Sequence, residues 1–124
     1  MKIERVTITK SDLATYLATH PLIWTDGNKY TVTAEKQSLL TTQLSLYQTA
    51  LSSGYAYELK WNSTGNESTV WKYEDLVELA LAINKYVQTL VAYQRAKEIE
   101  IMSCETLQEL ESIIVDYDLI ASIM

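Results

Sequence analysis

Residues 71–104, WKYEDLVELALAINKYVQTLVAYQRAKEIEIMSC, decide the fold of this chain, because nearly all of them are predicted to form one uninterrupted helix. A helix of roughly 30 residues extends about 45 Å at about 1.5 Å per residue. A compact domain of 124 residues has a radius of gyration of only ~14 Å. The helix is therefore longer than the domain that should contain it, which favours an oligomer or a docking protein.

The two halves of this helix differ in composition. From Tyr73 to Tyr93, apolar residues recur at three- and four-residue steps and cover more than one stripe of the helix surface. We therefore expect this half to be buried, either within the chain or between copies of it. From Gln94 to Cys104, charged and polar residues predominate, which predicts an exposed projection that reaches a neighbour.

A hairpin and a second helix are expected before the long helix. The Asp-Gly-Asn turn at residues 26–28 predicts a hairpin over residues 22–33, since Gly and Asn tolerate positive φ. Thr33 as N-cap and Gly54 just past the last turn delimit a predicted helix over residues 34–53.

A second hairpin should connect this helix to the long one. Side chains alternate between two faces over residues 55–62, which predicts a strand. A polar loop at residues 62–69 then leads into a short strand that ends at Trp71 and closes the hairpin.

The two ends of the chain carry weaker patterns. Residues 2–8 are predicted to form a modest strand and residues 12–19 a short helix that ends before Pro21. We expect this segment to be an arm that docks on a neighbour. A Thr-x-x-Glu capping box at Thr106 predicts a short helix over residues 106–115 that folds back on the long helix.

Together these elements predict an α+β fold. It comprises a small antiparallel sheet of two hairpins with one medium helix, one long helix of about 30 residues and a short C-terminal helix. The expected organisation is an N-terminal arm (1–21, strand plus short helix), an α+β domain (22–118) and an apolar C-terminal tail (119–124). The tail should pack either on its own domain or on a partner.

Composition limits the classes of function. The formal net charge is −6 and the basic residues are scattered, which argues against nucleic-acid binding. No apolar stretch is long enough for a membrane span, so we expect a soluble protein without a membrane partner. The chain has nine Tyr and three Trp, residue types that are enriched at interfaces.

No residue pattern identifies a reaction. His20 is the only histidine and Cys104 the only cysteine, so neither a disulfide nor a His- or Cys-based metal site is expected. Glu74, Asp75 and Glu78 could bind a cation or act as acid/base groups, but negative charge in the first helical turn already has a structural reason. We therefore expect no enzyme, no catalytic residue, no cofactor and no metal.

The order of elements from about Ile23 to Asp118 resembles a phage- and prophage-encoded domain family of unknown function found among tail-region proteins. The likeness is carried by three stretches, GNKYTVTAEKQSLLTTQLSLYQTALSSGYAYELKWN (27–62), WKYEDLVELALAINKYVQTLVAYQRAKEIEI (71–101) and CETLQELESIIVDYD (104–118). It covers roughly three-quarters of the chain and leaves out residues 1–21 and 119–124. It transfers no catalytic residues, and it implies a tail-assembly context by association.

These observations favour a non-enzymatic structural or assembly protein associated with phage tails, acting as a homo-oligomer or docking module. It would be located in the host cytoplasm during assembly or in the virion tail, with itself and other tail proteins as partners. The alternative is a small acidic accessory binding protein, either a tail-fibre chaperone or an inhibitor of a host defence protein. The candidate interface residues are Leu76, Ile83, Val87, Leu90, Tyr93, Ile99, Met102, Ile120 and Ile123.

Overall fold

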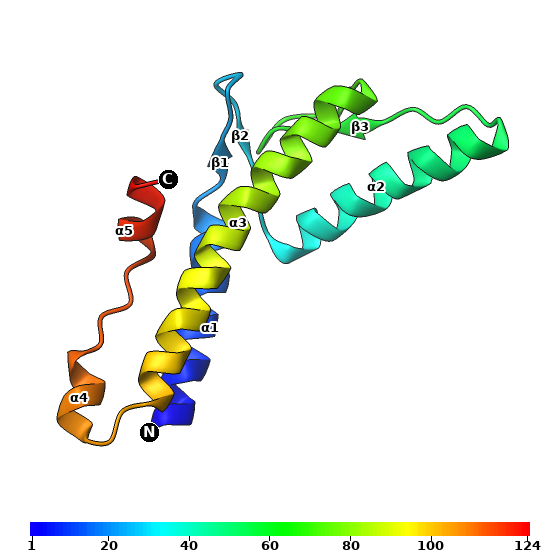
Figure 1. Cartoon of the computed structure of the whole chain (residues 1–124). Coiled ribbons are helices and arrows are strands. Elements are labelled where there is room, and N and C mark those ends of the chain that lie inside the picture. The colour runs from blue at the N-terminus through cyan, green and yellow to red at the C-terminus, as the bar shows by residue number, and fades with distance from the viewer. The chain divides into compact units, whose positions relative to one another are not determined.

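The computed structural model describes all residues from Met1 to Met124 and has an α+β fold, as the sequence predicts. It is 65% helical, with five helices and two separate two-stranded antiparallel sheets. Figure 1 shows their order along the chain. The elements are α1 (Lys2–Thr19), β1 (Leu22–Ile23), β2 (Lys29–Tyr30), α2 (Ala34–Ser53), β3 (Lys60–Trp61), β4 (Thr69–Val70), α3 (Tyr73–Met102), α4 (Leu107–Ser112) and α5 (Tyr117–Ser122).

The chain forms two compact units, and α3 contributes to both. The central unit is His20–Lys85, and the terminal unit combines Met1–Thr19 with Tyr86–Met124. The first boundary lies beside the expected end of the arm at residue 21. No boundary separates residues 118 and 119, because α5 runs across that position.

In the central unit, both predicted hairpins form. Leu22 pairs with Tyr30 in the first. The Asp26 carboxylate closes its turn by accepting a 2.9 Å hydrogen bond from the Asn28 N–H, an Asx-type turn. In the second hairpin, Lys60 pairs with Val70. The two hairpins are joined where the Thr64 N–H donates to the Lys29 carbonyl at 2.7 Å.

Helix α2 has the predicted bounds and caps. The Thr33 hydroxyl accepts a hydrogen bond from the Lys36 N–H at the N-terminus. At the C-terminus Gly54 has φ +77°, a left-handed conformation that glycine adopts without steric cost. Its N–H, with that of Tyr55, bonds the last carbonyls of the helix.

The strand predicted over residues 55–62 is wrong for most of its length, since only Lys60 and Trp61 are paired. The reason lies in the partner strand. The chain enters α3 at Tyr73, so β4 ends after its last cross-strand bond, in which the Trp71 N–H donates to the Leu59 carbonyl at 3.0 Å. Residues 55–58 have no strand beside them.

In the terminal unit, α1 replaces the strand predicted over residues 2–8, which is therefore wrong. Local β propensity is overridden by tertiary burial, because Thr9, Leu13 and Leu17 recur at helical spacing and are buried together. The Thr9 hydroxyl bonds the Arg5 carbonyl within the helix at 2.9 Å. The arm docks on its own chain, since the Lys2 ammonium donates to the Met102 carbonyl at 3.2 Å.

The second half of α3 is not the exposed projection that its composition suggests. Gln94 and Ile101 are buried, and Ile101 forms an apolar cluster with Cys104 and Leu110. Although charged residues predominate in this half, one face of the helix is apolar, and α1 and α4 cover that face. Figure 1 shows α1 lying beside this part of α3.

The predicted fold-back after the long helix is confirmed. In the capping box the Glu109 N–H donates to the Thr106 hydroxyl at 3.1 Å, and the Glu109 carboxylate accepts from the Glu105 N–H at 2.7 Å. Helix α4 then places Leu110 against Ile101. The Arg5 guanidinium, on α1, fixes the segment that folds back after α3 by donating to the carbonyls of Leu110 (3.3 Å) and Ile113 (2.7 Å).

We predict that Arg5→Met weakens the attachment of the segment that folds back after α3. Two carbonyls lose a charged donor, which costs about 1–2 kcal/mol of the free energy of unfolding. Urea denaturation measures the loss, and limited proteolysis should show earlier cleavage near residues 103–116. Lys10→Met is the control, because Lys10 is exposed in its ion pair with Glu98 at 3.6 Å, and such a pair should contribute little. An equal effect of the two changes would show that the Arg5 contacts do not secure this segment.

Candidate functional site

The nine candidate interface residues fall into three groups by exposure. Leu76, Ile83, Val87 and Leu90 are buried within the single chain. Tyr93 and Ile120 are half-buried. Exposed positions are held by Ile99, Met102 and Ile123. The interface role of the first four stays a prediction that requires the chain to open, whereas the last three are accessible as they stand.

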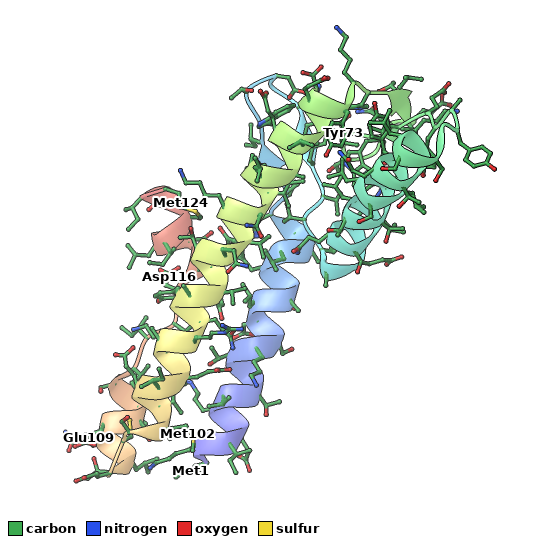
Figure 2. The ribbon with its side chains drawn as sticks, turned by 45° about the vertical axis from the view of Figure 1, so that its right-hand side comes forward. Met1, Tyr73, Met102, Glu109, Asp116 and Met124 are labelled. Carbon is green, nitrogen blue, oxygen red and sulfur yellow. The ribbon has the colours of Figure 1, made fainter.

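The C-terminal segment, residues 104–124, carries the exposed candidate Ile123. It is attached by the apolar cluster of Cys104 and Leu110 with Ile101 and by polar contacts. The Tyr117 hydroxyl donates to the Thr9 carbonyl at 2.8 Å, and the Asp116 N–H donates to the Tyr93 hydroxyl at 2.9 Å. The Asp116 carboxylate also caps α5 by accepting from two backbone N–H groups. Figure 2 shows Asp116 and Met124 along the same stretch of α3.

Several apolar side chains of this segment are exposed. Leu119 lies on α5 and Ile123, four residues later, is its C-cap and is 75% exposed. Burying such side chains would stabilise an association by about 25 cal/mol per Å² of apolar area. The exposed large apolar residues of the segment are Leu107, Ile114, Leu119, Ile123 and Met124.

The same segment is strongly acidic. It contains five acidic residues and no basic one, so it holds −5 of the formal net charge of −6. The five are Glu105, Glu109, Glu111, Asp116 and Asp118. An apolar surface framed by negative charge suits a partner that offers apolar contacts framed by Lys and Arg.

Four tyrosines gather where α1, α3 and α5 meet. The ring of Tyr117 packs against Tyr16 at 5.8 Å and against Tyr93 at 5.6 Å between centroids. Burial, with the nearby charges of Tyr86 and Asp118, raises the pKa of Tyr16 far above its usual range. Burial also raises the pKa of Tyr86. Burial, with the charges of Asp12, Tyr93 and Glu98, raises the pKa of Tyr117 to about 12.

A second aromatic group joins the two hairpins of the central unit. Trp24 stacks on Trp71 with ring centroids 5.9 Å apart, and Tyr30 packs edge-on against both. The Tyr30 hydroxyl donates to the Asp26 carboxylate at 2.7 Å. Burial and this carboxylate raise the pKa of Tyr30 to about 12. Partial desolvation acts to raise the pKa of Asp26, but hydrogen bonds from Tyr30 and Asn28 lower it below its usual value.

Two hollows lie along the seam between α2 and the first part of α3. The larger, about 470 Å³ and open to solvent, lies beside Tyr73 and is lined by Thr41, Leu44, Ser45, Gln48, Thr49 and Tyr73. The smaller, about 70 Å³, lies between Leu40 and Ile83. Neither is lined by a carboxylate, histidine, lysine or cysteine.

The residues that could have carried chemistry lie apart. Cys104 is buried, and its thiol donates to the Glu100 carbonyl at 3.3 Å. Glu74 and Asp75 lie in the first turn of α3. His20 is exposed at the boundary between the two units. No three His, Cys, Asp or Glu side chains are grouped so that they could hold a metal ion.

No helix combines the length and the apolar character that crossing a lipid bilayer requires.

Sequence reasoning missed several exposed apolar residues, among them Leu107, Ile114 and Leu119. The available signal was the short length of α4 and α5. A helix of six residues buries one turn at most, so a run with apolar residues at most positions must leave some in water. Comparisons with protein-family models, with curated proteins and with solved structures find no match to this chain.

We predict that the free energy of unfolding falls as pH rises from about 10 to about 12. Tyrosines of the unfolded chain ionise near pH ~10, while Tyr30 and Tyr117 in the folded chain keep their protons until about pH 12. The unfolded state therefore binds fewer protons over this range and is favoured. Urea denaturation at about pH 9 and about pH 11 measures the difference.

Substitution of Tyr30 and Tyr117 by phenylalanine tests whether these two residues cause the loss of stability at alkaline pH. Tyr117→Phe and Tyr30→Phe each remove one group that cannot ionise without leaving its buried site, so the double variant should lose less stability between the two pH values. An unchanged loss in the double variant would place the alkaline sensitivity elsewhere in the chain.

Proposed function

We propose that this chain is a non-enzymatic structural or assembly protein associated with phage tails, which acts as a homo-oligomer or docking module. The resemblance in residues 27–118 supplies the tail context. The observation that carries the docking role is the C-terminal segment, in which polar groups face the protein while Leu119 and Ile123 face water. Exposed apolar side chains grouped in this way are typical of interaction surfaces.

Charge indicates which kind of partner this segment would take. Two copies meeting through it would bring five acidic residues of each chain together. Like charges that face each other at an interface oppose association. The proposed role of this segment is therefore to bind a different protein with a basic, apolar surface, while self-association uses another part of the chain.

A second candidate function follows from the same acidic segment. A small acidic accessory protein, such as a tail-fibre chaperone or an inhibitor of a host defence protein, would also use an apolar surface framed by carboxylates. The two functions differ in location, since the accessory protein would be absent from finished virions.

We predict that a labelled copy of the chain is found in virion tails and that Ile123→Asp prevents its incorporation. The side chain is exposed, so the variant should fold, while the new charge would face the partner's apolar surface. Electron microscopy of virions from induced cells measures incorporation. Ser68→Asp, at an exposed loop position of the central unit, is the matched control.

The outcomes separate the two functions. Tails that contain the wild type and Ser68→Asp but not Ile123→Asp support the structural role. Virions without label, together with a complex between the chain and a non-virion host protein, would support the accessory role instead.

The oligomeric state is a separate test. Light scattering coupled to size exclusion should give more than one chain per particle at tens of micromolar. A clean monomer under these conditions would contradict the proposed self-association.

A further inference from the structure

We propose that two copies of this chain associate by antiparallel pairing of one segment, residues 55–58, in which the backbone of residues 56–58 makes no hydrogen bond within the chain. This inference rests on the self-association in the proposed function and names the surface that performs it. The same segment of a second copy is the proposed occupant.

The segment is the unpaired end of a strand. Residues 55–61 continue into β3, but β4 offers partners only as far as Trp71, which bonds Leu59. The Tyr55 N–H bonds the Ala50 carbonyl at 2.9 Å as part of the helix cap. No backbone hydrogen bond joins residues 56–58 to any other segment. Figure 1 shows this stretch running free between α2 and β3.

Its side chains alternate as in a β-strand. The Glu58 carboxylate lies 3.5 Å from the Lys60 ammonium, which places these two residues on one face. Tyr55 and Tyr57 belong to the opposite face by the same alternation, and both are exposed, Tyr55 to 76%. Tyrosine suits cross-strand pairs because its ring packs well on a pleated surface.

One edge of this strand is already closed. The Gln43 side-chain amide donates to the Lys60 carbonyl at 2.6 Å and accepts from the Lys60 N–H at 3.2 Å, so α2 covers that edge. Backbone groups alternate along a strand, so those of Tyr57 face the opposite edge, the one on which Leu59 meets β4. On that edge the backbone groups of Tyr57 have no partner, while the Tyr55 N–H bonds the Ala50 carbonyl.

Charge favours a second copy as the occupant. Residues 37–57 contain no charged side chain, although the chain as a whole carries −6. Two acidic molecules therefore repel each other least where these residues meet. Exposed Leu51, at the end of α2, lies beside the strand in sequence and adds apolar surface to the same region.

Pairing about Ala56 gives the open Tyr57 N–H an acceptor. Each Tyr57 N–H would donate to the Tyr55 carbonyl of the other copy, and the two Ala56 residues would face each other as a pair without mutual hydrogen bonds. Such a pair has a Cα separation of about 4.5 Å. This register leaves Glu58 opposite Gly54, so no like charges are opposed.

Proline substitution tests the backbone contact in the whole chain. Tyr57→Pro removes the donating N–H at an extended position, and we expect the apparent mass measured by light scattering to fall from that of a dimer to that of a monomer. Glu58→Pro is the matched control, because its N–H faces the opposite edge, and it should stay dimeric. Tyr57→Thr keeps the N–H and should also stay dimeric.

A cross-link tests the register without requiring the proline variant to fold. Ala56→Cys should form a disulfide-linked dimer under mild oxidation, since the Cα separation lies within the range that a disulfide spans. Ser68→Cys, in the exposed loop of the same unit, should not. The native Cys104 is buried and should not contribute.

The results distinguish this inference from the wider proposal. A dimer that survives Tyr57→Pro, with no cross-link through Ala56→Cys, would overturn the strand pairing and leave self-association standing. A monomeric wild type would overturn both. A monomeric wild type whose binding to a virion protein is lost in Tyr57→Pro would show that the edge takes a different chain's strand.

Discussion

Burial of α3 along its whole length is the constraint on which the rest of the structure depends. One helix of 30 residues is too long for a single small core. Each half of α3 is therefore buried by a different set of elements. The hairpins and α2 belong with Leu76 and Leu79, while α1 and the C-terminal segment belong with Leu90 and Ile101. Both chain ends are therefore needed to complete the terminal unit, although they are far apart in sequence.

Local signals predicted the elements whose ends are determined by their own residues. Helix α2 lies between Thr33 and Gly54 because one side chain caps its first turn and one glycine adopts the conformation that ends it. The hairpin turn and the Thr106 capping box are of the same kind. Each uses hydrogen bonds between residues a few positions apart, so the sequence alone contains the necessary information.

Elements determined by distant residues were not predictable in this way. The first residues of α1 have strand-like composition, but they are helical because α1 is buried at Thr9 and Leu13, and Thr9 contacts Tyr117 near the other end of the chain. Residues 55–58 have a strand pattern, and they are unpaired because α3 begins where a partner would be required. The candidate interface follows the same division. The spacing of apolar residues identified the interface candidates on α3. Only the fold shows that Leu90 is buried while Ile99 is exposed.

The attachment of the C-terminal segment has a consequence for how the chain would bind. The segment is held by the packing of Leu110 on Ile101 and by hydrogen bonds that join it to Arg5, Tyr93 and the Thr9 carbonyl. These contacts fix its position without using Leu119 or Ile123. A partner could therefore bury these side chains without displacing the segment. The acidic residues lie in this segment, and the uncharged run 37–57 lies in the central unit. One molecule could thus bind a copy of itself through the neutral region and a basic partner through the acidic one, because the two contacts use different residues.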